Sequence, residues 1–245
     1  AVVKNSNNVS FINNNIPVSV LLPILVTGSN NITLTSNNFG STTGSTGGWD
    51  GCVVDIRNSQ TVTVNQNDLF GKSNWKGFCI RNSIGIDIDA NIYAGGTSIG
   101  DSSSMGIGFI EGNPSSSNIQ IRNMNFYNLS GKLFIGGCTP SCSTTIVDSV
   151  SITGNTFYMS NHVITLDHTE GVTISDNIIK NSQSEAIWVQ ASPTGSHTIT
   201  DNTFDNISGT SIYLSTVVNN QGHTITGNTF TNNNVGIYHH NNNNQ

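Results

Sequence analysis

A short phrase that recurs along the whole chain is the strongest constraint on its fold. The phrase reads apolar–x–apolar–x–x–Asn–x–apolar, as in "HTITDNTF" at 197–204, and a copy begins every 22 to 33 residues. A repeat of this period is typical of chains built from stacked supersecondary units. The nine copies span residues 9–16, 32–39, 62–69, 86–93, 119–126, 150–157, 172–179, 197–204 and 223–230.

Each copy is followed by a second short apolar stretch, such as "VITL" at 163–166, "AIWV" at 186–189 or "SIYL" at 211–214. Short alternating stretches between Asn, Gly and Ser clusters predict β-strands, and no segment carries a helical apolar stripe. One unit alone cannot bury its apolar residues, but stacked units form a continuous core, with parallel strands about 4.8 Å apart. The sequence therefore predicts an all-β, right-handed parallel β-helix of about nine rungs, as a single domain over residues 1–245.

The asparagine in the phrase is predicted to be architectural. We expect it at the bend between two strands, because Asn tolerates the left-handed backbone of a tight bend. Asparagines stacked one rung apart can also form a hydrogen-bonded ladder. In the fifth copy Met124 takes this place and Asn125 follows it. The predicted ladder contains Asn14, Asn37, Asn67, Asn91, Asn155, Asn177, Asn202 and Asn228.

The low charge of the chain excludes several classes of partner. Charged residues make up only 9% of the chain and the formal net charge is −6, so a basic surface for nucleic acid is not expected. No run of about 18 apolar residues predicts a membrane span. No signal peptide is visible either. Modest charge and many Val, Ile and Thr residues argue against disorder, and nothing indicates a cofactor.

Four cysteines and four glycosylation motifs indicate a secreted protein at the cell surface or outside it. An even cysteine count favours two disulfides in an oxidising compartment, with free thiols or a zinc site as alternatives. The zinc alternative lacks paired Cys-x-x-Cys spacing. The cysteines are Cys52, Cys79, Cys138 and Cys142, and the Asn-x-Ser/Thr acceptors are Asn8, Asn31, Asn128 and Asn206.

On the repeat and its asparagines, the chain resembles the right-handed parallel β-helix repeat family, the pectate-lyase-like superfamily. The resemblance implies the fold over nearly the whole chain. The family includes polysaccharide lyases and hydrolases, uronan epimerases, phage tailspikes, copper-maturation proteins and surface proteins without known chemistry, so the fold does not choose a function. The chain looks most like the last, non-catalytic type.

Catalytic motifs of that family are largely missing here. Neither Gly-His-Gly with clustered Asp pairs nor Asp-Pro-His occurs, and "ITLDHT" at 164–169 looks like a pectate-lyase stretch without its Arg-x-Pro partner. Asp167 and His168 are neighbours on a predicted strand, so their side chains should point to opposite faces. We therefore predict no catalytic residue and no metal site, and leave open whether the chain is an enzyme.

The best candidate for ligand binding is a cationic and aromatic cluster on the middle rungs. "IRNS" occurs at 56–59 and again at 80–83, so Arg57 and Arg81 should lie on neighbouring rungs. Equivalent loops bring further residues, and an acidic glycan is the ligand this cluster would suit. The alternative is that Asp55 neutralises the arginines internally and the tryptophans only cover the core. The predicted cluster consists of Trp49, Arg57, Lys72, Trp75, Lys76 and Arg81.

Histidines provide a second, weaker candidate. His197 and His223 share one repeat position, so they lie one rung apart, either as a metal-binding pair or as a simple surface stack; the stack is the favoured interpretation. His239 and His240 lie in a polar tail for which no role is predicted.

Three functions follow as hypotheses. No capping helix is evident at either end, so the chain is predicted to be a secreted structural subunit that joins head to tail with copies of itself into a filament. The alternative is a polysaccharide-binding or lyase-type protein that acts on acidic glycans through the middle rungs. Ice or surface binding by a threonine-rich face ranks last, because the threonines align over few rungs.

Overall fold

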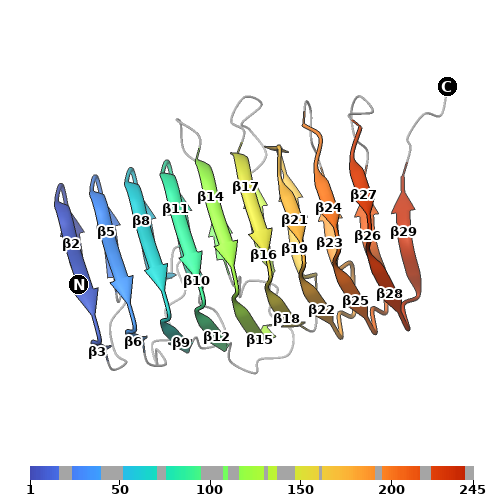
Figure 1. Cartoon of the computed structure of the whole chain (residues 1–245), viewed down its shortest axis with the longest axis horizontal. Coiled ribbons are helices and arrows are strands. Elements are labelled where there is room, and N and C mark those ends of the chain that lie inside the picture. The colour runs from blue at the N-terminus through green and yellow to red at the C-terminus, as the bar shows by residue number, and fades with distance from the viewer. Residues whose placement is uncertain are drawn as a thin grey trace.

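The computed structural model describes residues 1–16, 24–39, 52–70, 76–94, 107–109, 116–129, 132–136, 147–159, 162–190, 195–215 and 222–240. These residues form three parallel sheets that run the length of the molecule (Figure 1). The described part of the chain holds no helix that is long and apolar enough to cross a membrane.

Along the chain the strands recur in the order of sheets A, B and C, except that β20 and β21 both belong to sheet B. Sheet A holds β1 (Val2–Lys4), β4 (Ile24–Thr27), β7 (Cys52–Arg57), β10 (Lys76–Arg81), β13 (Ile107–Phe109), β16 (Leu133–Gly136), β19 (Ile164–Asp167), β23 (Ile187–Val189), β26 (Thr210–Leu214) and β29 (Val235–His239). Sheet B holds β2 (Asn7–Ile12), β5 (Asn30–Thr35), β8 (Gln60–Asn65), β11 (Ile84–Asp89), β14 (Ser117–Arg122), β17 (Val147–Thr153), β21 (Thr173–Ser175), β24 (Thr198–Thr200) and β27 (Thr224–Thr226), with β20 (Thr169–Glu170) beside β17. Sheet C holds β3 (Asn15–Ile16), β6 (Asn38–Phe39), β9 (Asp68–Phe70), β12 (Ile92–Ala94), β15 (Asn125–Leu129), β18 (Thr156–Met159), β22 (Ile178–Lys180), β25 (Thr203–Asp205) and β28 (Thr229–Thr231).

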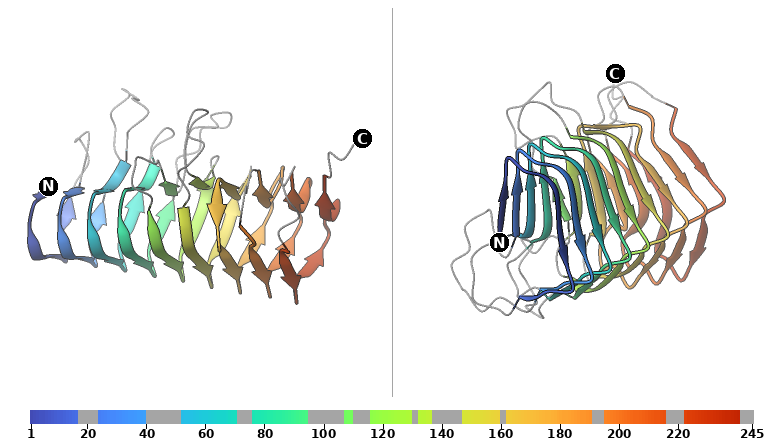
Figure 2. Two further views of the ribbon diagram at one scale, coloured as in Figure 1. Left: turned by 90° about the horizontal axis from the view of Figure 1, so that it is seen from above. Right: turned by 60° about the vertical axis from the view of Figure 1, so that its left-hand side comes forward.

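One strand from each sheet makes one rung, and the described strands make nine rungs, with β29 above the ninth. Figure 2 shows the resulting three-sided coil from its end. Successive rungs are joined by right-handed crossovers, as is usual for parallel strands. The predicted all-β solenoid of about nine rungs is confirmed.

The core is a column of stacked apolar residues, because residues at equal register positions on successive rungs lie directly above one another. Phe126 and Phe157 face inward from β15 and β18, and their rings stack 4.7 Å apart with planes 2° from parallel. Phe204 and Phe230 repeat this arrangement on rungs 8 and 9, with ring centroids 5.2 Å apart. Each ring therefore buries its face against an equal ring, which gives aromatic stacking in addition to burial.

The repeated asparagines form a continuous hydrogen-bonded ladder between sheets B and C. Asn177 Oδ1 accepts from both the backbone N–H and Nδ2 of Asn155 on the rung below, each at 2.9 Å. Asn155 Nδ2 also donates to the carbonyl of Ile121 at 2.9 Å. At Met124 the backbone N–H still donates to Asn155 Oδ1, and Sδ replaces the amide oxygen as an acceptor for Asn91 Nδ2 at 3.4 Å.

The bend itself differs from the expectation for these asparagines. The left-handed residue is the one before each ladder position, with φ between +50° and +68°, and no ladder asparagine has positive φ. The expectation that the asparagine adopts the left-handed backbone is therefore wrong. Its side chain reaches the next rung while the preceding residue makes the turn. These preceding residues are Asn13, Ser36, Gln66, Ala90, Asn123, Gly154, Asp176, Asp201 and Gly227.

A second ladder, not predicted from the sequence, runs along the turn between sheets A and B. The backbone N–H of Ser59 donates to Ser83 Oγ at 3.2 Å, and Ser83 N–H donates to Ser116 Oγ at the same distance. Ser6 and Ser29 make equivalent bonds on the first rungs. The serines of the two "IRNS" stretches, Ser59 and Ser83, therefore have a structural role as acceptors in this ladder.

A disulfide joins Cys52 of β7 to Cys79 of β10, with Cα atoms 5.9 Å apart. It ties rung 3 to rung 4 by a covalent bond in addition to the strand pairing. The other two candidates, Cys138 and Cys142, lie outside the described residues. A disulfide supports the oxidising environment that the cysteine count predicts.

The predicted glycosylation acceptors lie at turns or irregular strand positions. Asn8, Asn31 and Asn206 are exposed, with φ of 58°, 57° and 59°. Asn128 lies within β15, and its side chain is not among those described. Their glycosylation stays a prediction.

Candidate functional site

The predicted cationic cluster is only partly described. Arg57 and Arg81 occupy paired positions on β7 and β10. Arg57 is held on its own strand by the fully buried carboxylate of Asp55, with Nε 2.9 Å from Oδ1 and a second bond to Oδ2. Lys76 begins β10 but its side chain is not among those described. Trp49, Lys72 and Trp75 lie outside the described residues, so this cluster stays a prediction.

Asp167 and His168 contact each other, contrary to the expectation that they face opposite sides of a strand. Strand β19 ends at Asp167, and His168 has a left-handed backbone with φ of 51°. This turn brings His168 Nδ1 to 2.9 Å from Asp167 Oδ1. The alternation rule fails here because it applies only within the strand.

The outer face of sheet A carries a row of aromatic side chains on rungs 8 and 9 and on β29. Trp188, Tyr213 and Tyr238, here called the aromatic row, occupy paired positions on β23, β26 and β29. Trp188 and Tyr213 meet edge to face at 6.2 Å, and Tyr213 and Tyr238 stack at 5.3 Å. They point outward because Ile187, Val189 and their equivalents on the same strands point into the core.

A polar cluster lies at the rung 7 end of the aromatic row. The imidazole of His162 stacks on Trp188 with centroids 5.2 Å apart, and its Nδ1 is 2.8 Å from Glu185 Oε2. Ser184 Oγ donates to the same carboxylate oxygen at 2.5 Å. Burial lowers the pKa of His162, the charge of Glu185 raises it, and that of Lys132 lowers it. At neutral pH His162 is therefore a neutral ring that donates from Nδ1 and keeps Nε2 as an acceptor.

These polar residues do not form a nucleophilic relay. Ser184 Oγ is 3.3 Å from Nδ1 and 3.4 Å from Nε2 of His162. An oxygen nearly equidistant from both nitrogens lies over the ring face, away from either in-plane lone pair. Ser184 also donates its proton to Glu185, so it cannot donate it to His162.

Two buried polar atoms at this end of the row have no hydrogen-bond partner among the described residues. They are Thr165 Oγ1 and Trp188 Nε1, on paired positions of β19 and β23. The side chain of Thr165 is fully buried. Buried polar groups normally find a partner, and both of these atoms are closed to solvent. The charge of Lys132 acts on His162 and lowers its pKa. Burial lowers the pKa of Lys132 itself, while the charge of Asp167 raises it.

Sequence reasoning missed this site, although one signal was present. The apolar stretches "AIWV", "SIYL" and "VGIY" each place one aromatic residue among aliphatic ones. In strand alternation, that residue faces away from its aliphatic neighbours and so lies on the outer face.

Three parallel sheets around a stacked apolar column define the chain as a right-handed parallel β-helix protein. Residues 102–245 match the family model described as "Periplasmic copper-binding protein (NosD)". This match covers more than half of the chain, and the chain belongs to that family. No curated protein sequence matches it significantly.

A solved structure supports the fold. The chain is similar to an alginate lyase from Paenibacillus sp., with a TM-score of 0.52 and 11% identity over 93% of this chain and 98% of that one. An endopolygalacturonase from Stereum purpureum matches with a TM-score of 0.31 and 14% identity over 98% and 96% of the two chains. At 11% identity the first similarity shows a shared fold.

The family name raises the question of copper, and the described residues do not fit a copper site. They contain no group of three or more His, Cys, Asp or Glu side chains that could hold a metal ion. Cys52 and Cys79 are joined in the disulfide. His197 and His223 each use Nδ1 to accept a backbone N–H, which leaves the proton on Nε2 and no lone pair for a metal.

Proposed function

We propose that this chain is an extracytoplasmic β-solenoid that binds a polysaccharide chain non-covalently on the outer face of sheet A, along the aromatic row. The observation that carries the proposal is the register of Trp188, Tyr213 and Tyr238, which places three aromatic side chains on successive strands of sheet A. The family name, which contains the word periplasmic, and the disulfide support a location outside the cytoplasm.

The physical argument rests on how sugars contact proteins. A pyranose ring has a flat C–H face and an equatorial belt of hydroxyls. The aromatic row offers a line of apolar ring surface whose centroids lie 6.2 and 5.3 Å apart from rung to rung. His162 Nε2 lies at one end of the row on a partly exposed ring, where a sugar hydroxyl would donate to it.

Binding is favoured over cleavage by the state of the acidic groups. Glu185 is engaged by His162 and Ser184, and Asp167 is engaged by His168. A cleaving site needs a general acid or base within reach of the proton it transfers, and neither carboxylate is available for that role in this arrangement. The alginate lyase similarity supports a glycan-facing fold without extending its reaction to this chain.

We expect Trp188→Ala and Tyr213→Ala each to weaken polysaccharide binding about tenfold or more, because each removes a central stacking surface. Titration calorimetry with alginate, polygalacturonate and a soluble neutral glucan measures this. The matched control is Tyr127→Ala, which removes an aromatic residue of sheet C that is 39% exposed. The proposal fails if none of the three glycans binds the unaltered protein, or if Trp188→Ala binds as tightly as the control.

A second proposal, end-to-end association of copies, is favoured by the surface of rung 9. Phe230 continues the inner phenylalanine stack but stays 36% exposed, and Ile237 of β29 is 49% exposed. Another copy that continues the strands and ladders would bury them. Negative-stain electron microscopy is expected to show fibres with an axial repeat on the order of 40 Å. Single short rods at high protein concentration would contradict it.

A further inference from the structure

The ladder between sheets A and B changes its chemistry at the C-terminal rungs. On the lower rungs the side-chain acceptor is a serine hydroxyl, as at Ser59 and Ser83. On rungs 8 and 9 it is a histidine nitrogen: Val172 N–H donates to His197 Nδ1 at 3.3 Å, and His197 N–H donates to His223 Nδ1 at 3.1 Å. Among the described residues of this ladder, the same backbone bond depends on a titratable group at these two rungs.

We propose that His197 and His223 form an acid-sensitive latch that holds rungs 7, 8 and 9 together at neutral pH and releases them in acid. The two rings stack with centroids 5.2 Å apart and planes 17° from parallel. His197 is only 1% exposed, whereas His223 is partly exposed, so the expected surface stack is buried at His197.

Protonation breaks the latch for two reasons. A proton on Nδ1 removes the lone pair and sets one N–H against another. It also places a charge in a buried position, beside a second ring of the same kind. Burial first, and then the charge of His223, lower the pKa of His197 to about 4. Burial and the charge of His239 lower the pKa of His223.

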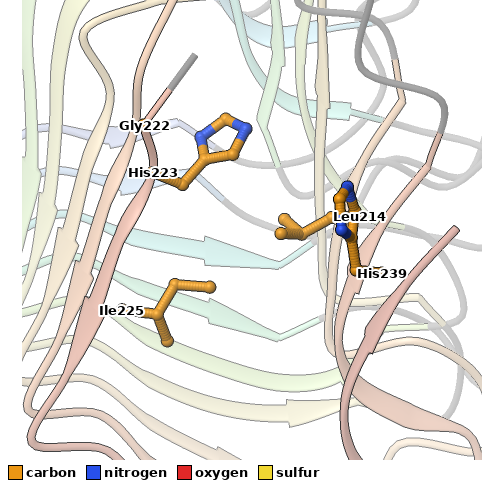
Figure 3. Close-up of a pocket in the computed structure, with 5 residues that line it drawn as sticks. All are labelled: Leu214, Gly222, His223, Ile225 and His239. Atoms are coloured by element: carbon orange, nitrogen blue, oxygen red, sulfur yellow. The ribbon is translucent and has the colours of Figure 1, made fainter. Parts of the chain in front are cut away.

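The other titratable groups near the latch do not reverse the lowering of the two histidine pKa values. The charges that act on the two imidazoles are those of His223 on His197 and of His239 on His223. Glu170 is exposed and therefore screened. His239 lies across an open hollow of about 460 Å³ from His223, with Leu214 between them (Figure 3). This hollow gives solvent, and so protons, a route to the upper side of the latch.

The direction of the pH effect follows from the lowered pKa. Unfolded histidine titrates near 6.5, above the folded value of about 4 for His197. Its contribution to stability is therefore complete above pH about 6.5 and is lost as the pH falls toward 4. Titration of His197 alone should raise the equilibrium constant for opening these rungs on the order of 30-fold when the pH falls from 8 to 5. Because each rung contacts only its neighbours, opening should stay local.

Hydrogen–deuterium exchange of the whole chain at pH 8 and pH 5, corrected for intrinsic exchange rates, tests the latch. We expect amides of β21, β24 and β27 to lose protection at pH 5, whereas β5, β8 and β11 keep theirs. In the double variant His197→Ser and His223→Ser, which extends the serine acceptors upward, the pH-dependent loss should disappear. Equal loss in the variant and the unaltered protein would overturn the proposal.

A second measurement applies even if the double variant does not fold. Proton NMR of the imidazole C–H resonances should give His197 a titration midpoint near 4. A midpoint near 6.5 would contradict the latch.

Copper provides the competing interpretation. Added Cu(I) or Cu(II) at pH 7 should leave the His197 and His223 resonances unchanged, because their Nδ1 lone pairs are occupied. Copper-dependent protection of rungs 8 and 9 that is lost in the double variant would identify a metal pair in place of a latch.

Discussion

Replacement of Asn155 by Ala is expected to destabilise the protein by about 4 kcal/mol, since it removes hydrogen bonds to buried groups on the rungs before and after it. The N–H of Met124 loses its acceptor and the carbonyl of Ile121 loses its donor. Asn177 Oδ1 keeps only one of its two bonds from this rung. Chemical denaturation followed by circular dichroism measures the change in free energy of unfolding.

The control for this prediction is Asn30→Ala, an exposed asparagine on β5 outside the ladder. A surface substitution of this kind should change the free energy of unfolding by less than about 0.5 kcal/mol. If both variants unfold at the same denaturant concentration, the ladder does not stabilise the fold as argued.

The second large effect is expected for Gly209→Ala, with a loss of about 3 kcal/mol. A Cβ at Gly209 would lie 2.6 Å from the backbone carbon and 2.7 Å from the carbonyl oxygen of Ser184. Backbone atoms cannot turn aside as a flexible side chain can, so rungs 8 and 9 must separate. Because Ser184 and Glu185 belong to the polar cluster, glycan binding should weaken as well.

Gly222→Ala is the matched control, since a Cβ there meets nothing within 4 Å. Thermal unfolding of the two variants should differ by several degrees for a chain of this size. Similar melting temperatures would mean that the turn at Gly209 relaxes without separating the rungs.

The fold was predictable from the sequence because every rung contains a copy of the same short phrase. Nine copies of one phrase predicted nine rungs, and the ladder positions follow from the fixed asparagine. The left-handed positions were not predictable, because nearly any residue occupies them: Gln66 and Ala90 adopt the same backbone as Gly154. There the stacked neighbours override the intrinsic preference of the residue.

The candidate site was much harder to predict. His162 and Trp188 come from different rungs, and their contact depends on how the intervening turn places His162 before β19. The tryptophans at 49 and 75 drew the prediction toward the loops, whereas Trp188 looked like one more apolar residue of a strand. Alternation assigns Trp188 to the outer face, but only the register shows that Tyr213 and Tyr238 continue the same line.

The asparagine ladder also gives the solenoid a direction. Each link that ends on an asparagine runs the same way, from the backbone N–H of one rung to the amide oxygen of the next. At each of these asparagines the backbone N–H points to the following rung, and the side-chain Oδ1 accepts from the preceding one. Two donor faces brought together about a twofold axis would leave both sets unsatisfied, so symmetric pairing through these faces is disfavoured. A rung accepts a neighbour only in the same orientation, so the solenoid can lengthen by whole rungs without reversing.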